Sequence, residues 1–317
     1  MIRVEYKAIE DLQHNPAAEW QSGSIFCERD WLLAVANMGR GEVGIWQVLQ
    51  DDALVAFAPV LWRRTTFGRM ALLPPLTPYW GYAIKPGLDA TTTVHILNEL
   101  VKHGVGWRIS LPPSQTLPAV SFPTRIATHT TQIIQSKPKE QLWHDLAASC
   151  RQKIRSAQNE ELTIRDGDPE ELALLMVETF QRRKVRFPLD RATLDKTLTI
   201  LVDSGLCHIK GISRKGGTSL NMRMVARDKQ RKISYDIAAG SAEGLRGGAG
   251  NLLLWEEIIE EAGLGHALDL VGTGVSGVAD FKRSFGGDEK RYLVMEMFRD
   301  KVSEMRYRLG RRLGMLK

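Results

Sequence analysis

Apolar and polar positions along the chain follow patterns typical of short strands and amphipathic helices. Residues 2–9 alternate as in a strand, and residues 29–38 have the apolar spacing of a helix. Two β-rich runs within residues 42–64 flank the pair Asp51 and Asp52, which indicates a hairpin. The chain is therefore expected to open with a strand and a helix, followed by a β-hairpin.

The remainder of the first half combines a loop, a helix and short strands. Residues 74–82 are rich in proline and aromatic residues, so a rigid and partly buried loop is expected there. Residues 91–104 are predicted to form a helix. Short strands with proline-rich turns are predicted over residues 106–140, and an amphipathic helix over residues 137–149.

The second half shows more helical periodicity. The predicted helices cover residues 150–160, 169–184, 190–204, 251–262 and 279–284. The predicted strands cover residues 161–167, 266–272 and 290–298, with three successive strands within residues 207–240. Asp168 is the expected N-cap of the helix that begins at residue 169. The three successive strands form an antiparallel meander that loosely repeats the hairpin of residues 42–64, so the two halves are expected to be structural duplicates.

The composition is that of an ordinary globular protein. The 317 residues are 43% hydrophobic and 25% charged, which excludes disordered and fibrous classes. One core seldom grows beyond about 250–300 residues, so we expect two domains, residues 1–135 and 136–298, followed by a basic helix at 299–317. The pattern predicts an α/β (α+β) fold, in which each domain is a mixed, mostly antiparallel sheet flanked by helices.

The chain carries a formal net charge of +6, which favours anionic partners such as phosphates, nucleotides, nucleic acid or an acidic membrane. The 43 basic residues are interspersed with 37 acidic ones, so a solvated mixed surface explains the charge equally well. The basic residues are too dispersed to favour a nucleic-acid-binding protein, and no specific nucleic acid is expected as a partner, transfer RNA excepted.

The three cysteines, Cys27, Cys150 and Cys207, are far apart and have no C-x-x-C spacing. A disulfide scaffold or a zinc site is therefore not expected, and no metal is predicted. The N-terminal residues include acidic side chains, and no apolar run is long enough to cross a bilayer. We expect a cytoplasmic protein without a signal peptide or a membrane span.

A glycine-rich loop at residues 244–250 leads directly into the predicted helix at 251–262. Helix N-termini present unpaired N–H groups and a partial positive charge, so they bind phosphates well. The residues predicted to bind the phosphates of a cofactor are Arg246, Gly247, Gly248, Gly250 and Asn251. Alternatively, the glycines only end a strand and allow close helix packing.

Four segments follow one another from residue 251 onward: a leucine-rich helix (NLLLWEEII), a strand containing aspartate (LDLVG), a glycine-rich loop (TGVSGVAD) and the run FKRSFGG. In this order they resemble the Fem-type aminoacyltransferases and related acetyltransferase-like (GNAT) proteins. The basic helix CRQKIRSAQNE and the segment ETFQRRKV are also similar to that family. The resemblance implies two tandem GNAT-like domains. The helical insertion with which some Fem-type proteins contact transfer RNA has no counterpart here.

The resemblance assigns roles to several residues of this chain. Lys282 matches a lysine that stabilises the oxyanion formed during acyl transfer, and Phe281 would shape the acyl pocket. Arg182 matches a basic residue that holds a phosphate-bearing acceptor, and Arg186 is the nearby alternative. Without the resemblance, each of these basic residues would be read as a solvated surface side chain.

Transfer to an amine or hydroxyl also requires a proton acceptor. The residues themselves offer Asp236, Tyr235, His208 and Asp269 as candidates, and we select Asp236 as the catalytic group with Tyr235 as a substrate-binding neighbour. Alternatively, Asp236 pairs with a nearby arginine. Deprotonation by water or by the substrate would require none of the four.

The function expected from the sequence is acyl or aminoacyl transfer from acyl-CoA or aminoacyl-tRNA. The expected acceptor is an amine or hydroxyl of a small-molecule, lipid-linked or nucleotide-linked precursor of the cell envelope or of a polysaccharide. A catalytically inactive, GNAT-shaped binding protein is the alternative. The basic C-terminal helix either makes peripheral contact with the inner membrane or serves as a packing or oligomer-forming tail. Nothing in the sequence indicates the oligomeric state.

Overall fold

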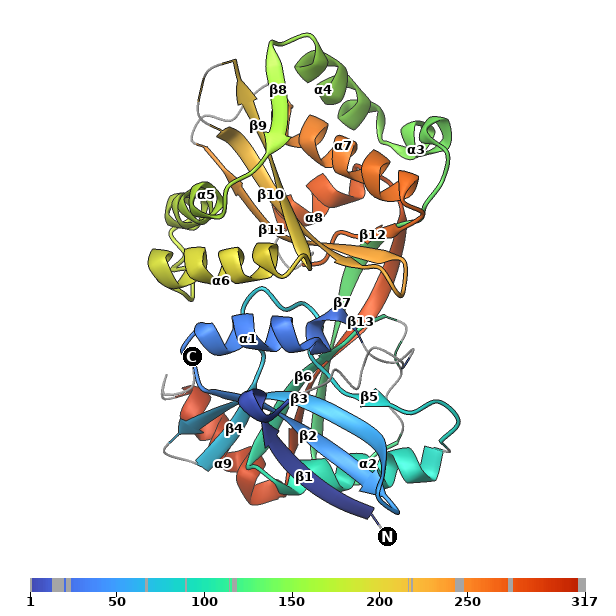
Figure 1. The fold of residues 1–317 in the computed structure, drawn as a ribbon, viewed down its shortest axis with the longest axis vertical. Coiled ribbons are helices and arrows are strands. Elements are labelled where there is room, and N and C mark those ends of the chain that lie inside the picture. The colour runs from blue at the N-terminus through green and yellow to red at the C-terminus, as the bar shows by residue number, and fades with distance from the viewer. Residues whose placement is uncertain are drawn as a thin grey trace. The chain divides into compact units, whose positions relative to one another are not determined.

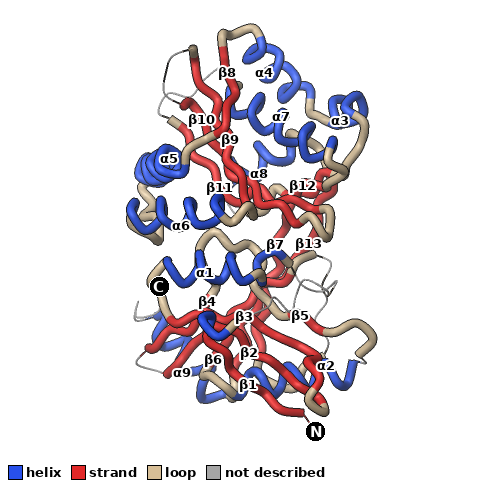
Figure 2. Tube along the Cα trace, viewed as in Figure 1, coloured by secondary structure: helices blue, strands red, loops and turns tan. Residues whose placement is uncertain are grey.

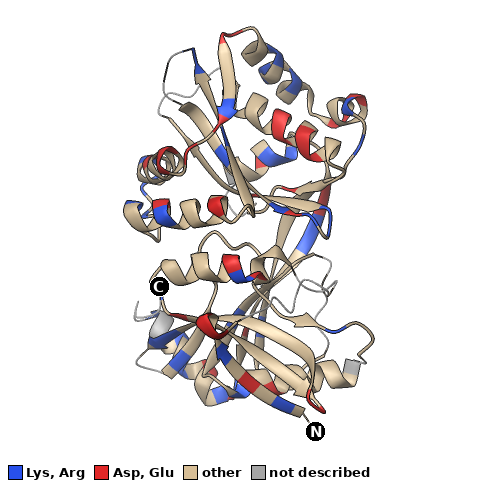
Figure 3. Ribbon diagram, viewed as in Figure 1, with Lys and Arg blue, Asp and Glu red and all other residues tan. Residues whose placement is uncertain are grey.

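A computed structural model describes residues 2–12, 20, 24–65, 68–88, 90–113, 115, 119–215, 217, 219–242, 248–272 and 276–312. The chain divides into two compact units. Unit 1 consists of residues 1–129 and 291–317, and unit 2 of residues 130–290. Acidic and basic residues are interspersed over both units (Figure 3), in keeping with the composition.

Unit 1 is built around one sheet with helices on both faces. Its strands are β1 (Ile2–Ala8), β2 (Glu42–Gln50), β3 (Ala53–Thr65), β4 (Gly68–Leu72), β5 (Ala83–Ile84) and β6 (Gly106–Leu111), joined by part of β13 (Asp288–Phe298). Its helices are η1 (Ile9–Asp11), η2 (Ile25–Cys27), α1 (Arg29–Asn37), α2 (Ala90–Lys102) and α9 (Lys301–Arg312). Figure 1 shows α1 on one side of the sheet and α2 and α9 on the other.

Unit 2 is also built around a sheet with helices on both faces. Its strands are β8 (Leu162–Asp166), β9 (Cys207–Arg214), β10 (Ser219–Asp228), β11 (Ile233–Ser241) and β12 (Ala267–Asp269), joined by part of β7 (Thr124–Ile134). Its helices are α3 (Lys139–Asp145), α4 (Ala148–Gln158), α5 (Pro169–Arg182), α6 (Arg191–Asp203), α7 (Ala249–Gly263) and α8 (Ser276–Arg283). Figures 1 and 2 show α5 and α6 on one face of the sheet and α4 and α7 on the other.

The two sheets have the same plan. In unit 1 the order β1-β2-β3-β4-β6-β13 contains one parallel pair, β4 with β6, and the other pairs are antiparallel. In unit 2 the order β8-β9-β10-β11-β12-β7 also contains one parallel pair, β11 with β12. A helix connects the strands of each parallel pair, α2 in unit 1 and α7 in unit 2. The predicted duplication of the two halves is therefore present in the strand order.

The last strand of each sheet comes from the other half of the sequence. β7 follows β6 of unit 1 along the chain but pairs with β12 in unit 2, and β13 follows β12 but pairs with β6 in unit 1. The sequence-based boundaries placed residues 291–298 in the second domain, whereas their hydrogen bonds to β6 place them in the sheet of unit 1. Helix α9 also belongs to unit 1.

Each unit has its own apolar core. In unit 1, Trp62 and Trp107 are buried against apolar side chains of α2, and the two rings meet edge to face at 5.2 Å. In unit 2, α7 buries Leu253 and Trp255 against α4 and the sheet. Among the described residues, no helix has the length and apolar character that crossing a bilayer requires.

Local signals in the sequence account for several element boundaries. Asp51 and Asp52 both have positive φ, 50° and 63°, and form the two-residue turn of the predicted β2–β3 hairpin. The predicted N-cap, Asp168, accepts a hydrogen bond from the Glu171 N–H at 3.1 Å. The predicted proline-rich loop is confirmed, since Tyr79 and Trp80 within it are almost fully buried.

Candidate functional site

A cavity of about 500 Å³ lies in unit 2. β11, α8 and the end of α5 form most of its wall, and β10 contributes polar side chains. Lys282, Phe281, Asp236 and Arg223 all line it, so the cavity brings together three residues that the sequence predicted and one that it did not.

The cavity begins where the sheet of unit 2 separates. β11 and β12 pair only from Ile233–Ala267 to Tyr235–Asp269, although β11 continues to Ser241. A register shift opposite Met224 and Val225 bulges β11 at the same level. Beyond Tyr235, β11 no longer pairs with β12, and residues 236–241 line the cavity along this unpaired edge. Such an edge presents N–H and C=O groups to an extended ligand.

Lys282 is buried in the wall of this cavity, with 7% of its surface exposed. Its Nζ donates hydrogen bonds to the carbonyl oxygens of Leu270 and Val271. Burial lowers the pKa of Lys282 below the ordinary lysine value of 10.5, while the carboxylates of Asp236 and Asp269 oppose that shift and Arg223 adds to it. The side chain is thus held in place by backbone oxygens rather than by an ion pair.

Asp236 and Arg223 form a buried ion pair beside Lys282. The guanidinium of Arg223 donates from Nε to Asp236 Oδ1 at 3.1 Å and from Nη2 to Oδ2. The two side chains are 2% and 5% exposed. The guanidinium also lies 5.8 Å from the centre of the Phe281 ring, which brings the predicted pocket residue into the same cluster. Both carboxylate oxygens of Asp236 are therefore occupied by one arginine.

Asp269 shapes the backbone that binds Lys282. Its carboxylate is fully buried and accepts hydrogen bonds from the Val271 N–H at 2.9 Å and from the Thr131 hydroxyl. The two carbonyls that bind Lys282 belong to the residues immediately after Asp269. Asp269 therefore stabilises the loop that binds Lys282, and it does not line the cavity.

The predicted phosphate loop is described only from Gly248 onward, and Arg246 and Gly247 lie outside the described residues. Gly248 precedes α7 with a φ of +83°, and a Cβ there would lie 2.4 Å from the carbonyl oxygen of Lys153. Glycine is required at this position on both counts. Gly250 lines the cavity, so the N-terminus of α7 lies at its edge.

Asn251 is buried in the first turn of α7, with its amide donating to Cys150 Sγ at 3.5 Å. Tyr235 is also buried and does not line the cavity, although it adjoins Asp236 on β11. These two predicted binding residues therefore have side chains in the interior of unit 2.

The end of α5 contributes the mouth of the cavity. Arg182 does not line it; its guanidinium donates to the carbonyl oxygen of Ser241 and to the Thr179 hydroxyl at 3.1 Å, and so connects α5 to the end of β11. Thr179 and Arg183 line the cavity instead. Arg186 is exposed beyond the end of α5.

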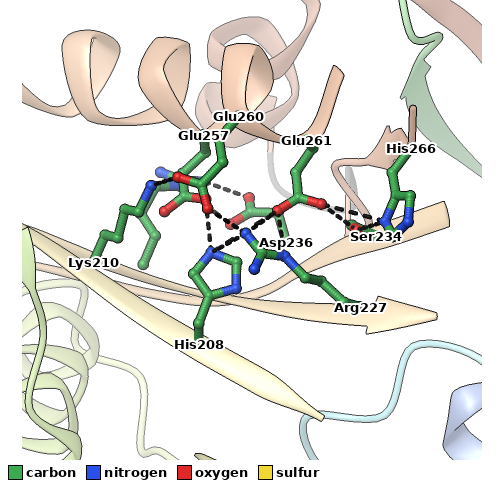
Figure 4. A network of polar contacts seen from close by, with 10 residues as sticks. His208, Lys210, Arg227, Ser234, Asp236, Glu257, Glu260, Glu261 and His266 are labelled. Atoms are coloured by element: carbon green, nitrogen blue, oxygen red, sulfur yellow. Dashed lines mark hydrogen bonds and ion pairs between the residues drawn. The ribbon is translucent and has the colours of Figure 1, made fainter. Parts of the chain in front are cut away.

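A second polar cluster lies between α7 and the sheet (Figure 4). Arg227 donates from Nε to Glu261 Oε1 at 2.7 Å and from Nη2 to Glu260, while His208 Nε2 lies 2.9 Å from Glu257 Oε2. Glu257 and Glu261 are fully buried. Ligand atoms of His208, Glu260 and Glu261 lie within 4.8 Å of one another, a spacing that a metal ion can use. The guanidinium of Arg227 already compensates the charge of both Glu260 and Glu261 there.

The sequence prediction missed Arg223 and Arg183. Arg223 lies in the middle of the meander, in a strand whose neighbours Met222 and Met224 are apolar and buried. A charged residue at such a position requires a buried partner. That partner is Asp236, so the structure shows the pairing with an arginine that the sequence offered as the alternative to a catalytic role. Arg183 directly follows the predicted Arg182. The orientation of α5 determines which of the two lines the cavity, and the sequence pattern does not specify it.

Solved structures share this architecture over most of the chain. The crystal structure of FemX aligns with a TM-score of 0.62 at 12% identity, covering 92% of this chain and 96% of that one. The C-terminal domain of a protein described as a lysylphosphatidylglycerol synthetase from Agrobacterium fabrum aligns with a TM-score of 0.52 at 10% identity, covering 87% and 90%. A GNAT-family acetyltransferase from Colwellia psychrerythraea aligns with a TM-score of 0.51 at 14% identity, covering 94% and 99%.

In sequence, no family model matches the chain, and a search of curated proteins gives no match. The structural alignments cover both units at low sequence identity, so they show a shared fold. The mixed sheets, each with one parallel pair bridged by a helix, agree with the predicted α/β class. The chain therefore has the two-unit, GNAT-like fold that it shares with FemX.

Proposed function

We propose that this chain is a cytoplasmic acyltransferase. It would move an acyl or aminoacyl group from acyl-CoA or aminoacyl-tRNA to an amine or hydroxyl of a cell-envelope or polysaccharide precursor. The observation that carries the proposal is the position of Lys282, buried in the wall of a cavity of about 500 Å³ beside the Arg223–Asp236 pair. A cavity of this size accommodates a small-molecule substrate.

The hydrogen bonds of Lys282 suggest how it acts. An ammonium group has three N–H donors, and two of them are directed at the carbonyls of Leu270 and Val271. The third is available for a substrate oxygen. When the acceptor attacks the acyl carbon, negative charge develops on that oxygen, and a fixed donor in a site of low dielectric stabilises it. The donor's thiol or ribose oxygen then leaves with its bonding electrons and takes up the proton that the acceptor loses.

Asp236 has a positioning role in this proposal. Because both of its oxygens bind Arg223, it holds the guanidinium over Phe281 and supplies negative charge near Lys282. The acceptor's proton would then reach the leaving group directly or through solvent. Of the two donors, the strand edge at residues 236–241 favours the extended, amide-containing arm of acyl-CoA, with its phosphates at the N-terminus of α7.

The donor is tested by isothermal titration calorimetry of the full chain with acetyl-CoA, longer acyl-CoAs and charged transfer RNA. Turnover is then followed by thiol release with amino sugars and lysine-containing peptides as acceptors. Lys282→Ala is expected to lower kcat about 100-fold or more, the range for loss of one oxyanion donor. Arg283→Gln is the control, because Arg283 lies on the same helix, is exposed and does not line the cavity.

The pH profile separates two roles for Lys282. If it stabilises the oxyanion as an ammonium, activity falls as pH rises through its lowered pKa. If it accepts the acceptor's proton as a neutral amine, activity rises over the same range. A folded Lys282→Ala variant with undiminished turnover would overturn the proposal, and binding of a donor without any turnover would instead support a GNAT-shaped binding protein.

A further inference from the structure

Helix α9 presents an exposed apolar stripe. Val302, Met305 and Leu309 follow one another at helical spacing, and their exposed fractions are 54%, 67% and 52%. At 100° per residue they fall within one narrow sector of the helix. The other exposed large apolar side chains that the structure describes are scattered singly over other elements. Isolated exposures are ordinary, whereas a contiguous stripe marks an interaction surface.

The opposite face of α9 attaches the helix to unit 1. Tyr307 is 7% exposed, packs against Phe298 and donates from its hydroxyl to Glu296 Oε1 at 2.6 Å. Ser303, on the same side of the helix, is 3% exposed. Asp300 caps the helix by accepting a hydrogen bond from the Ser303 N–H at 2.7 Å, and this bond contributes most to lowering the Asp300 pKa to about 2. The apolar stripe therefore points away from the core on a fixed helix.

Basic residues border the stripe on both sides. Arg308 and Arg312 fall on the side of Met305, and Arg306 falls on the side of Val302, all of them exposed. Figure 3 marks the basic positions of α9 in blue. None of these three arginines forms an ion pair with another residue in the described part of the chain. Among the described residues, no acidic side chain compensates their charge next to the exposed apolar side chains.

We propose that this face of α9, formed by Val302, Met305, Leu309, Arg306, Arg308 and Arg312, docks onto an anionic lipid bilayer. The helix would lie in the plane of the interface, with its aliphatic side chains among the upper acyl chains and its arginines at the phosphates. Twelve residues give a helix of about 18 Å, long enough to lie on the surface and too short to cross it. The proposal is independent of the acyltransferase activity.

The charge pattern favours a lipid surface over other occupants. A second copy of the chain would place the same arginines against each other, which is repulsive. A nucleic acid would neutralise the arginines but leave the three aliphatic side chains without an apolar partner. An anionic bilayer satisfies both components of the face.

Binding is expected to be reversible and to require both components, because three aliphatic side chains anchor a protein only weakly. Near an anionic surface each arginine strengthens binding about fivefold at moderate ionic strength. The attraction should fall steeply with salt, since the Debye length shrinks from about 10 Å at 0.1 M to about 3 Å at 1 M.

The test is co-sedimentation of the full chain with vesicles of phosphatidylcholine containing 40% phosphatidylglycerol, compared with phosphatidylcholine alone. The wild-type chain should bind the anionic vesicles and not the neutral ones. Both R306Q/R308Q/R312Q and M305S/L309S should weaken binding at least tenfold. The matched control is K139Q/K196Q/K229Q, which removes the same charge from exposed lysines on other elements and should bind nearly as wild type does.

Two results would overturn the proposal. One is binding of the arginine variant as tight as that of the control, with both folded by circular dichroism. The other is self-association that depends on α9, seen by analytical ultracentrifugation in the absence of any vesicle binding. Because acyl transfer is measured separately on soluble substrates, failure here leaves that function untouched.

Discussion

Lys282 donates a hydrogen bond from Nζ to the carbonyl oxygen of Val271, a β-branched residue whose φ is +30°. Few β-branched residues adopt positive φ, because Cβ then crowds the backbone. Asp269 holds this conformation from the other side by accepting the Val271 N–H. The strained backbone of Val271 and the buried ammonium of Lys282 thus hold each other in place. Backbone strain of this kind is concentrated at functional sites.

The lowered pKa of Lys282 predicts a pH-dependent stability. Between that lowered value and 10.5, the folded chain binds fewer protons at this residue than the unfolded chain, so the free energy of unfolding rises with pH. Lys282→Met removes this contribution. The wild type should therefore gain stability relative to the variant as pH rises from 7 toward 10.5, measured by urea unfolding at several pH values. A difference that stays constant across this range would contradict the lowered pKa.

Replacing one member of the Arg223–Asp236 pair is expected to lower the free energy of unfolding more than replacing both. Asp236→Leu leaves the Arg223 guanidinium buried without a carboxylate, at a cost of about 3–5 kcal/mol in the free energy of unfolding. Arg223→Met should cost a similar amount by leaving the carboxylate uncompensated. The double variant R223M/D236L should be more stable than either single one in urea unfolding. Simple additivity of the two losses would show that the pair is not coupled.

The same reasoning applies to Arg227 at the α7 interface. Arg227→Met leaves the fully buried Glu261 without its guanidinium, so a loss of about 3–5 kcal/mol in the free energy of unfolding is expected. Thermal or urea unfolding measures it, and adding Glu261→Gln should recover part of the loss. If Arg227→Met were nearly neutral, the cluster in Figure 4 would be solvated rather than buried.

Signals within a few residues make most helices and strands predictable from the sequence, whereas contacts between distant residues set some of their boundaries. The Asp51–Asp52 turn and the Asp168 cap act within a few residues, and both were predicted. The two helices predicted at residues 137–149 and 150–160 are present, but the predicted boundary between them is displaced. The structure has α3 and α4 with Leu146 extended between them, because the Ala147 N–H bonds to Ser284, far away in sequence.

The candidate site shows the same division. The run FKRSFGG indicated Lys282 and Phe281, which line the cavity. Which residues surround them depends on a bulge in β11 and on the rotation of α5. Periodicity reports on neither, so Arg223 and Arg183 were missed. The sequence predicts Asn251 and Tyr235 as binding residues from their neighbours along the chain, but both side chains are buried in the core.

Two glycines of the α7 region give opposite predictions for the same substitution. Gly248→Ala forces a Cβ to within 2.4 Å of the Lys153 carbonyl at a φ of +83°, so a loss of about 1–3 kcal/mol in the free energy of unfolding is expected. Gly263 is the last residue of α7, and a Cβ there meets nothing within 4 Å.

Gly263→Ala should therefore raise the free energy of unfolding by about 0.5–1 kcal/mol, because alanine restricts the unfolded chain and suits a helix better. Urea unfolding of the two variants beside wild type measures both signs at once. Equal effects would mean that the left-handed conformation at Gly248 is not required. In that case the close approach of Gly248 to Lys153 of α4 would not restrict the residue at the start of α7, where the phosphate site is predicted.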